Sequence, residues 1–169
     1  MKQLTPAQFE QLRQLGSCTV ANAIETFDAH LRNTGFSDSR IRCIFEDFPP
    51  MVGYAATVRI RTSEPPMEGH SHYYRLDWLD HVSSIPPPRI LVLEDMDKYP
   101  GLGSLIGDVH INILAALGCV GVVTNGAVRD LPAARAIHFQ MFAHNLSVSH
   151  AFAHIFDFGK SVEVGHIEV

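Results

Sequence analysis

The sequence predicts an α/β fold with a mixed central sheet. Helical and extended patterns alternate along the chain, the arrangement that packs helices against a largely parallel sheet. Two short apolar runs, at residues 90–93 and 119–123, suit strands that are covered on both faces. Residues 53–62 instead alternate Val58 and Ile60 with arginines, which is typical of a strand with one face in water. The two strand types together indicate a mixed sheet.

Size and composition limit what the protein can be. With 169 residues, 46% of them hydrophobic, the chain is long enough to form one domain over residues 1–169 with a substantial core. A net charge of -5 without a Lys/Arg-rich run argues against nucleic-acid binding. No apolar run approaches the length of a membrane span and the N-terminal segment lacks the apolar core of a signal peptide, so we expect a cytoplasmic protein. The three widely spaced cysteines predict reduced core thiols.

Three helices are predicted in the first half of the chain. Residues 5–8 form a capping-box pattern with Pro6 at the first helical position, and Gly16 closes that helix. A second helix follows, with Thr19 as its cap and a core-facing stripe at helical spacing. That stripe consists of Val20, Ala23, Ile24, Phe27 and Leu31. A third helix is expected at residues 73–82, with Leu76, Trp78 and Leu79 facing inward.

In the second half of the chain, the element with the clearest start and end signals is a helix. It begins at Gly107 and Asp108, ends at Gly118, and is followed by the strand at 119–123, which Asn125-Gly126 would break. Further strands are expected at 139–143 and 162–169, with a helical segment at 150–156 between them.

The adjacent residues Arg129 and Asp130, just after this strand, are the main candidates for chemistry. Backbone N–H groups at the start of a helix favour anions, and the planar guanidinium of arginine pairs well with a carboxylate. A ligand carboxylate could therefore lie between the amides after Gly107 and the side chain of Arg129, while Asp130 gives a hard oxygen to a divalent cation. The alternative is a surface turn in which Asp130 only caps a short helix. Asp108 would then only interact favourably with the dipole of the helix that it begins.

The block from Gly107-Asp108 to Gly126-Ala127-Val128-Arg129-Asp130 resembles the signature of the regulator of ribonuclease E activity A family, which includes 4-hydroxy-4-methyl-2-oxoglutarate aldolases. The likeness extends to the helix at 19–27 and to the segments GYAATVRIRT and RILVLED. It implies a swivelling β/β/α-type domain that assembles as a homotrimer or a hexamer, with active sites near subunit boundaries. Family members commonly continue past the position of Val169, which leaves open a missing C-terminal strand segment.

The resemblance also implies a class II, metal-dependent carbon–carbon lyase that uses Mg²⁺ or Mn²⁺. Its substrate would be a small 2-keto acid, cleaved by aldol cleavage of 4-hydroxy-4-methyl-2-oxoglutarate type, by decarboxylation of oxaloacetate, or by both, through a pyruvate enolate. Arg129 and Asp108 would be the catalytic residues, Asp108 by orienting a water, and Asp130 would contact the metal. The groups that would bind the substrate are the side chain of Arg129 and the backbone amides of Gly107, Asp108, Val109 and His110.

Other interpretations remain open at this point. The family takes its name from members that bind and restrain a ribonuclease, so a non-catalytic regulator is the alternative function. A methyltransferase is disfavoured because no glycine-rich loop follows an early strand. Neither His150 and His154 nor His70 and His72 form a convincing metal motif, and the acidic run 95–97 is best interpreted as a strand end near the ligand crevice.

Overall fold

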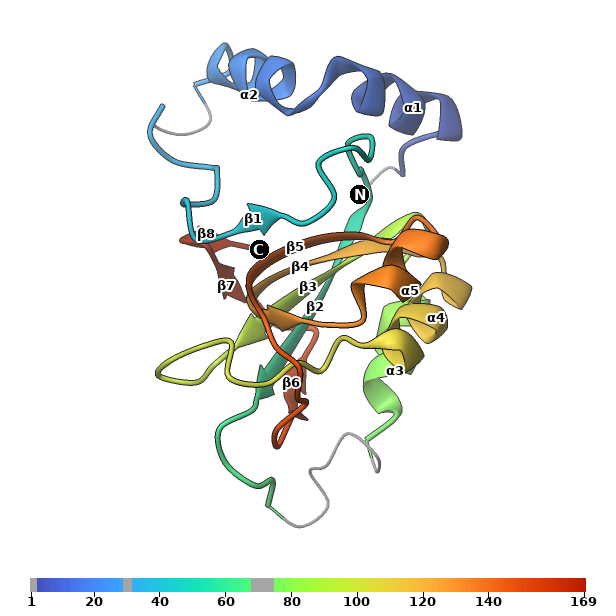
Figure 1. Cartoon of the computed structure of the whole chain (residues 1–169). Helices are drawn as coiled ribbons and strands as arrows, with labels where there is room; N and C mark the ends of the chain where they lie inside the picture. Colours follow the sequence, from blue (N-terminus) through green and yellow to red (C-terminus); the bar gives the residue numbers. More distant parts are fainter. Residues whose placement is uncertain (1–2, 29–31, 68–74) are drawn as a thin grey trace.

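The computed structural model describes residues 3–28, 32–67 and 75–169, and its centre is a six-stranded mixed sheet (Figure 1). The strand order is β1-β5-β4-β3-β2-β6. The strands are β1 (Arg42–Cys43), β2 (Tyr54–Arg61), β3 (Arg89–Asp95), β4 (Cys119–Val128), β5 (Gln140–Leu146) and β6 (His154–Phe158). The inner four are parallel and the two edge strands are antiparallel, so the predicted α/β class with a mixed sheet is confirmed.

Three helices link the parallel strands and cover the same face of the sheet (Figure 1). They are α3 (Asp77–Ser84), α4 (Asp108–Ala116) and α5 (Leu131–Ala136). Trp78 of α3 and Ile111 and Leu114 of α4 are fully buried and belong to the same apolar cluster as Leu91 and Val122 of the sheet. This cluster is the main core, because burying these side chains removes their apolar surface from water.

The other face of the sheet carries a short hairpin of β7 (Glu163–Val164) and β8 (Ile167–Glu168). A smaller apolar cluster there joins Val162 and Val164 to Val92, with Val123 packed against it. Both faces of β3 and β4 are thus covered, as their apolar sequences predict, and the layers are β/β/α. The single strand expected at 162–169 is wrong, because Gly165 and His166 have positive φ angles that turn the chain back.

The first helix, α1 (Pro6–Leu15), has the predicted capping box of Thr5 and Gln8. Phe9, its one buried residue, packs edge-on against Tyr54 with 5.4 Å between ring centroids. The Tyr54 hydroxyl accepts a hydrogen bond from the backbone N–H of Leu4 at 2.7 Å. The helix is thus joined to β2 through one aromatic pair and one hydrogen bond.

The second helix, α2 (Ser17–Glu25), differs from its prediction in two ways. It begins directly after Gly16, so Thr19 lies inside the helix and the prediction that Thr19 caps it is wrong. The prediction of a core-facing stripe is also wrong, since no residue of α2 is buried and Phe27 is 78% exposed. Amphipathic spacing defines an apolar face but not what covers it. Leu31 lies outside the described residues.

Strand β4 runs through the predicted break at Asn125-Gly126 and reaches Val128. Its register against β5 shifts between Thr124 and Ala127, so a turn-forming pair is accommodated as an irregularity inside the strand. At this irregularity the Asn125 side chain binds the backbone of β3. Its Nδ2 donates to the backbone oxygen of Asp95 at 3.0 Å, and its Oδ1 accepts from the Asp95 N–H at 2.7 Å. The side chain thus replaces ladder hydrogen bonds between β3 and β4.

Two other local predictions need correction. Residues 150–156 are not helical: a turn with Ala151 at φ 47° leads into β6, which pairs with β2. Helix α3 begins only at Asp77, so Leu76 precedes it and is 62% exposed rather than inward, whereas Trp78 is buried as predicted. Tyr73 and Tyr74 lie outside the described residues.

The cysteines are all free, as predicted. Cys119 is buried, which raises the pKa of its thiol to about 11, but Cys18 is exposed on α2 and is not a core thiol. None of the helices within the described ranges combines the length and the apolar character required to cross a bilayer.

We expect Asn125→Leu to lower the free energy of unfolding by about 2 kcal/mol, because the N–H and C=O of Asp95 would lose their partners. Urea unfolding followed by circular dichroism measures this. Asn33→Ala, at an exposed position, is the control and should change the value by less than about 0.5 kcal/mol. An unchanged value for Asn125→Leu would contradict the bridging role.

Candidate active site

The predicted site residues are brought together by a short extension of the sheet. Ile106 forms an isolated parallel bridge with Val128, and the backbone N–H of Arg129 donates to the Ile106 oxygen at 3.1 Å. These contacts place the start of α4, at Gly107 and Asp108, beside the chain that leaves β4. Arg129 and Asp130 therefore lie next to a helix N-terminus, as the sequence predicted.

Asp130 caps α4 from a distance. Its Oδ2 accepts a hydrogen bond from the Asp108 N–H at 2.9 Å, while Gly107, at the N-cap position, has no side chain to offer. The next amide, that of Val109, donates to Oδ1 of Asp108 at 2.8 Å. A substrate carboxylate bound to these two amides would therefore replace oxygens of Asp130 and Asp108.

The contact between the two segments is tight and slightly strained. Asp130 has φ 56° and ψ 42°, a left-handed conformation that costs a residue with a Cβ about 1–2 kcal/mol. A Cβ at position 107 would lie 2.7 Å from both Arg129 Nε and Asp130 Oδ2. A residue larger than glycine at 107 would therefore push these two polar groups out of their present positions. Backbone outliers such as Asp130 are common at functional sites.

Arg129 has an unsatisfied donor. Its Nε lies 3.7 Å from Asp130 Oδ2, which is an ion pair but too long for a hydrogen bond. The same Nε is buried and has no hydrogen-bond partner within the part of the chain that the structure describes. A buried donor without an acceptor costs about 1–3 kcal/mol, and a carboxylate is the acceptor that best fits a guanidinium.

A pocket of about 260 Å³ opens beside Arg129. Three of the predicted site residues line it: Arg129, Val109 and His110. Gly107, Asp108 and Asp130 are not among its lining residues; Asp108 and Asp130 are exposed beside it. The structure therefore separates the predicted residues into a pocket wall and an acidic pair next to it.

Trp78 and His150 are two of the pocket residues that were not predicted as site residues. Trp78 comes from α3, with its ring centroid 6.0 Å from that of His110, and His150 comes from the turn before β6. Nδ1 of His150 lies 2.7 Å from the carbonyl oxygen of Ala151; since a carbonyl only accepts, this nitrogen carries the proton and Nε2 is an acceptor in the neutral ring. No local pattern marks these residues, because the fold brings them in from distant segments.

The acidic pair fits a hard divalent cation that keeps most of its waters. In residues 3–28, 32–67 and 75–169, no group of three or more His, Cys, Asp or Glu side chains converges as a ligand set. Mg²⁺, however, is commonly held by only one or two carboxylates, with water and substrate oxygens completing its shell. The half-exposed Asp130, hydrogen-bonded to the amide of Asp108, provides such oxygens.

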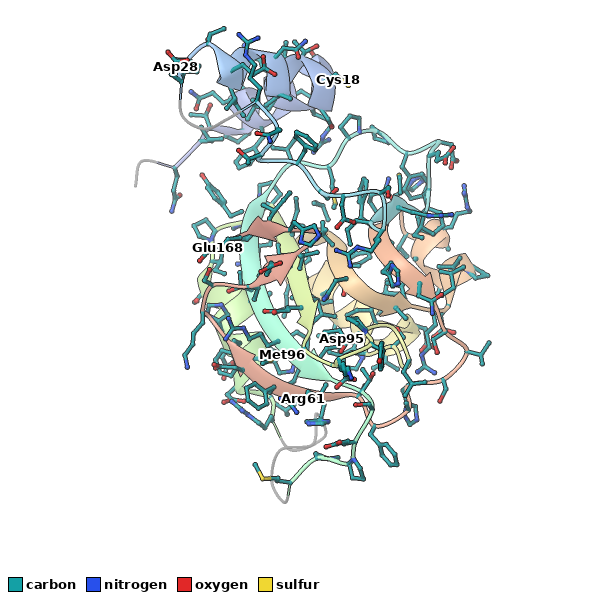
Figure 2. All side chains as sticks on the ribbon, turned by 90° about the vertical axis from the view of Figure 1, so that its left-hand side faces the viewer. Cys18, Asp28, Arg61, Asp95, Met96 and Glu168 are labelled. Carbon is teal, nitrogen blue, oxygen red and sulfur yellow. The ribbon has the colours of Figure 1, made fainter. Side chains whose placement is uncertain are left out.

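The acidic end of β3 is a structural cluster instead. The buried Asp95 accepts from the N–H groups of Gly101 and Asp97, and Oδ2 of Asp97 accepts from Thr62 and Ser63. Burial raises the pKa of Asp95; at Asp97 the hydrogen bonds outweigh burial and lower the pKa. Figure 2 shows Asp95 and Met96 at the far end of the sheet from Cys18. Because these carboxylate oxygens accept hydrogen bonds, they hold the loop after β3 in place.

Among the described residues, His150 and His154 belong to no group of three or more side chains that could hold a metal ion. His154 is buried, with Nδ1 2.7 Å from the Phe152 oxygen, and it lies on β6 rather than on a helix with His150. His70 and His72 lie outside the described residues.

The chain belongs to the RraA-like family: the family model described as Aldolase/RraA matches residues 17–169. This confirms the resemblance inferred from the sequence. A comparison with curated proteins gives no match.

Solved structures share the fold at low sequence identity. A protein described among novel cellulases from microbes associated with the gut ecosystem has a TM-score of 0.81 at 16% identity, over 100% of this chain and 72% of that chain. RraAS2 of Streptomyces coelicolor, described as an unusual member of the RNase ES inhibitor RraA family, has a TM-score of 0.69 at 17% identity, over 98% and 78%. The RNA-processing inhibitor RraA from Thermus thermophilis has 0.57 at 14%, over 88% and 81%. These similarities support the fold alone.

We expect Gly107→Ala to weaken the binding of pyruvate at least about ten-fold, or ~1.4 kcal/mol, because the new Cβ would displace Arg129 and Asp130. Trp78 is the one tryptophan of the chain and lines the pocket, so its fluorescence can report the titration. Ala116→Ser, on the exposed last turn of α4, is the control. Equal affinity in both variants would show that the contact is not needed for the anion site.

We also expect Asp97 to stabilise the protein at neutral pH and to lose this effect in acid. Because its pKa is lowered in the folded state, its contribution is present above about pH 4 and disappears as the pH falls towards the folded pKa. The free energy of unfolding should thus fall less between about pH 6 and pH 3 in Asp97→Asn than in the wild type. Asp95, whose pKa shift has the opposite sign, is present in both proteins. Glu64→Gln, an exposed control, should follow the wild type.

Proposed function

We propose that the protein is a divalent-metal-dependent lyase that releases pyruvate from a 2-keto acid. The observation that carries the proposal is the side chain of Arg129, which lines a pocket beside the carboxylates of Asp130 and Asp108. Its buried Nε has no hydrogen-bond partner among the described residues. A site with one planar cation and two nearby hard oxygens suits a small anionic substrate and a hydrated metal ion. Membership of the Aldolase/RraA family is consistent with this chemistry.

Arg129 would bind the carboxylate next to the keto group and face the charge that develops as the carbon–carbon bond breaks. Asp108 would orient a water that takes the proton from the 4-hydroxyl group. Asp130, with Asp108 beside it, would hold Mg²⁺ or Mn²⁺. When bound, such an ion supplies a Lewis acid that stabilises a pyruvate enolate. The same enolate forms in aldol cleavage of a 4-hydroxy-2-keto acid and in decarboxylation of oxaloacetate, so one site can serve both reactions.

A second candidate is a non-catalytic regulator that binds a ribonuclease or another protein. Large apolar side chains outside the pocket favour it, since Phe27 is 78% exposed and Val148 fully exposed. The same surfaces suit a homotrimer or hexamer, which we propose as the assembly of the enzyme, with the cytoplasm as its location.

We expect pyruvate release from oxaloacetate and from 4-hydroxy-4-methyl-2-oxoglutarate in the presence of Mg²⁺, above the rate without protein, and its loss with a chelator. Arg129→Ala should lower kcat/KM at least about 100-fold, or ~2.7 kcal/mol, since the substrate carboxylate loses its charged partner. Arg32→Ala removes a highly exposed arginine and should leave the rate unchanged.

Retained turnover in Arg129→Ala would contradict the proposed site, and turnover that survives the chelator would contradict the metal. If neither substrate reacts, a pull-down against the ribonuclease tests whether the protein is a non-catalytic regulator. Binding that is retained in Asp130→Ala but lost when surface charges are changed would favour it.

A further inference from the structure

We infer that the pocket beside Arg129 selects 2-keto acids whose far end is uncharged and apolar rather than dicarboxylic acids. This inference rests on the proposed lyase function and ranks its substrates: dicarboxylic acids such as oxaloacetate would be cleaved, but less efficiently than substrates with an uncharged far end. The preferred substrates would be aldol adducts of pyruvate with an aliphatic or aromatic aldehyde or ketone.

The charge of the lining is the first argument. Arg129 is the one side chain with a permanent positive charge among the described residues that line the pocket, and the substrate carboxylate next to the keto group already needs it. Arg75 does not line the pocket: it pairs with Asp77 at 3.0 Å and stacks over Phe158. Among the described residues of this chain, a second carboxylate would therefore find no further permanently charged cation in the pocket lining.

The apolar lining is the second argument. Trp78, Val109 and Ile113 line the pocket, and three leucines and one alanine complete its apolar surface. An ionised carboxylate placed against such a surface loses its hydration, and these apolar side chains give no hydrogen bond to replace it. A methyl or ring group at the same place loses only unfavourable contact with water. Both effects favour an uncharged far end.

The imidazole of His150 fits this substrate class. It lines the pocket, and a neutral imidazole has one donor and one acceptor nitrogen. His150 uses Nδ1 on the Ala151 oxygen and so retains Nε2 as an acceptor. This suits one hydroxyl group, such as that on C4 of an aldol adduct, better than a second carboxylate, which can only accept.

A matched pair of ligands tests the inference by binding alone. 2-Oxopentanoate and 2-oxoglutarate have the same chain length and differ only in a terminal methyl or carboxylate group. With the full chain and Mg²⁺, we expect Trp78 fluorescence to report at least about ten-fold tighter binding of 2-oxopentanoate. Ile113→Arg adds a cation to the wall at a partly exposed position and should reverse the preference, whereas Ile137→Arg, outside the pocket, should not.

A second pair tests turnover. 4-Hydroxy-2-oxopentanoate would give pyruvate and acetaldehyde, and 4-hydroxy-2-oxoglutarate would give pyruvate and glyoxylate. In each case the C3–C4 bond breaks, the 4-hydroxyl proton leaves, and the bond's electrons remain on the pyruvate enolate, which is then protonated on carbon. We expect kcat/KM to be at least about ten-fold higher for the substrate with the methyl end.

The outcomes separate this inference from the function on which it rests. Tighter binding or faster cleavage of the dicarboxylic member, with dependence on Arg129 retained, would overturn the inference and leave the lyase standing. Binding of both acids that is unchanged in Arg129→Ala, together with no pyruvate release from any substrate, would overturn both.

Discussion

The parallel bridge between Ile106 and Val128 is the contact on which the candidate site depends. Strand β3 pairs with β4 only as far as Leu93 and Thr124, and beyond the irregularity at Asn125 the chain around Ile106 takes the place beside β4. Because the chain around Ile106 replaces β3 at this position, the start of α4 lies beside the residues that follow β4. At this contact a Cβ on residue 107 would lie 2.7 Å from the side chains of Arg129 and Asp130, and Asp130 has a left-handed conformation.

The loop that delivers Ile106 is itself fixed by buried polar groups. Asp95 and Asp97 hold its first part through backbone N–H groups, and the side-chain amide of Asn145 donates to the Gly101 oxygen. A backbone segment that must pass from the end of one strand to the side of another needs such partners, because its own N–H and C=O groups leave the ladder. The acidic residues at this strand end thus fix the path of the chain.

The sequence predicted the features that depend on neighbouring residues better than those that depend on contacts with distant segments. The strands at 90–93 and 119–123, helix α4 and the capping box of α1 depend on local composition and were predicted correctly. The burial of the apolar face of α2, the continuation of β4 through Asn125 and strand β6 depend on distant partners, so periodicity alone did not predict them correctly. Within the site, Arg129 and Asp130 carried a signal because they form a contiguous motif. Trp78 and His150 carried none, since only the tertiary fold places them at the pocket.

The N-terminal helices contact the rest of the protein through few buried side chains, and this affects their local stability. Helix α1 meets the sheet through Phe9 and Tyr54, and α2 buries no side chain at all. Such a unit can open while the sheet stays folded, since few apolar contacts are lost. Its amides should therefore exchange with solvent hydrogen far sooner than those of β3 and β4 in an isolated subunit, and a partner that covers α2 would appear first as slower exchange there.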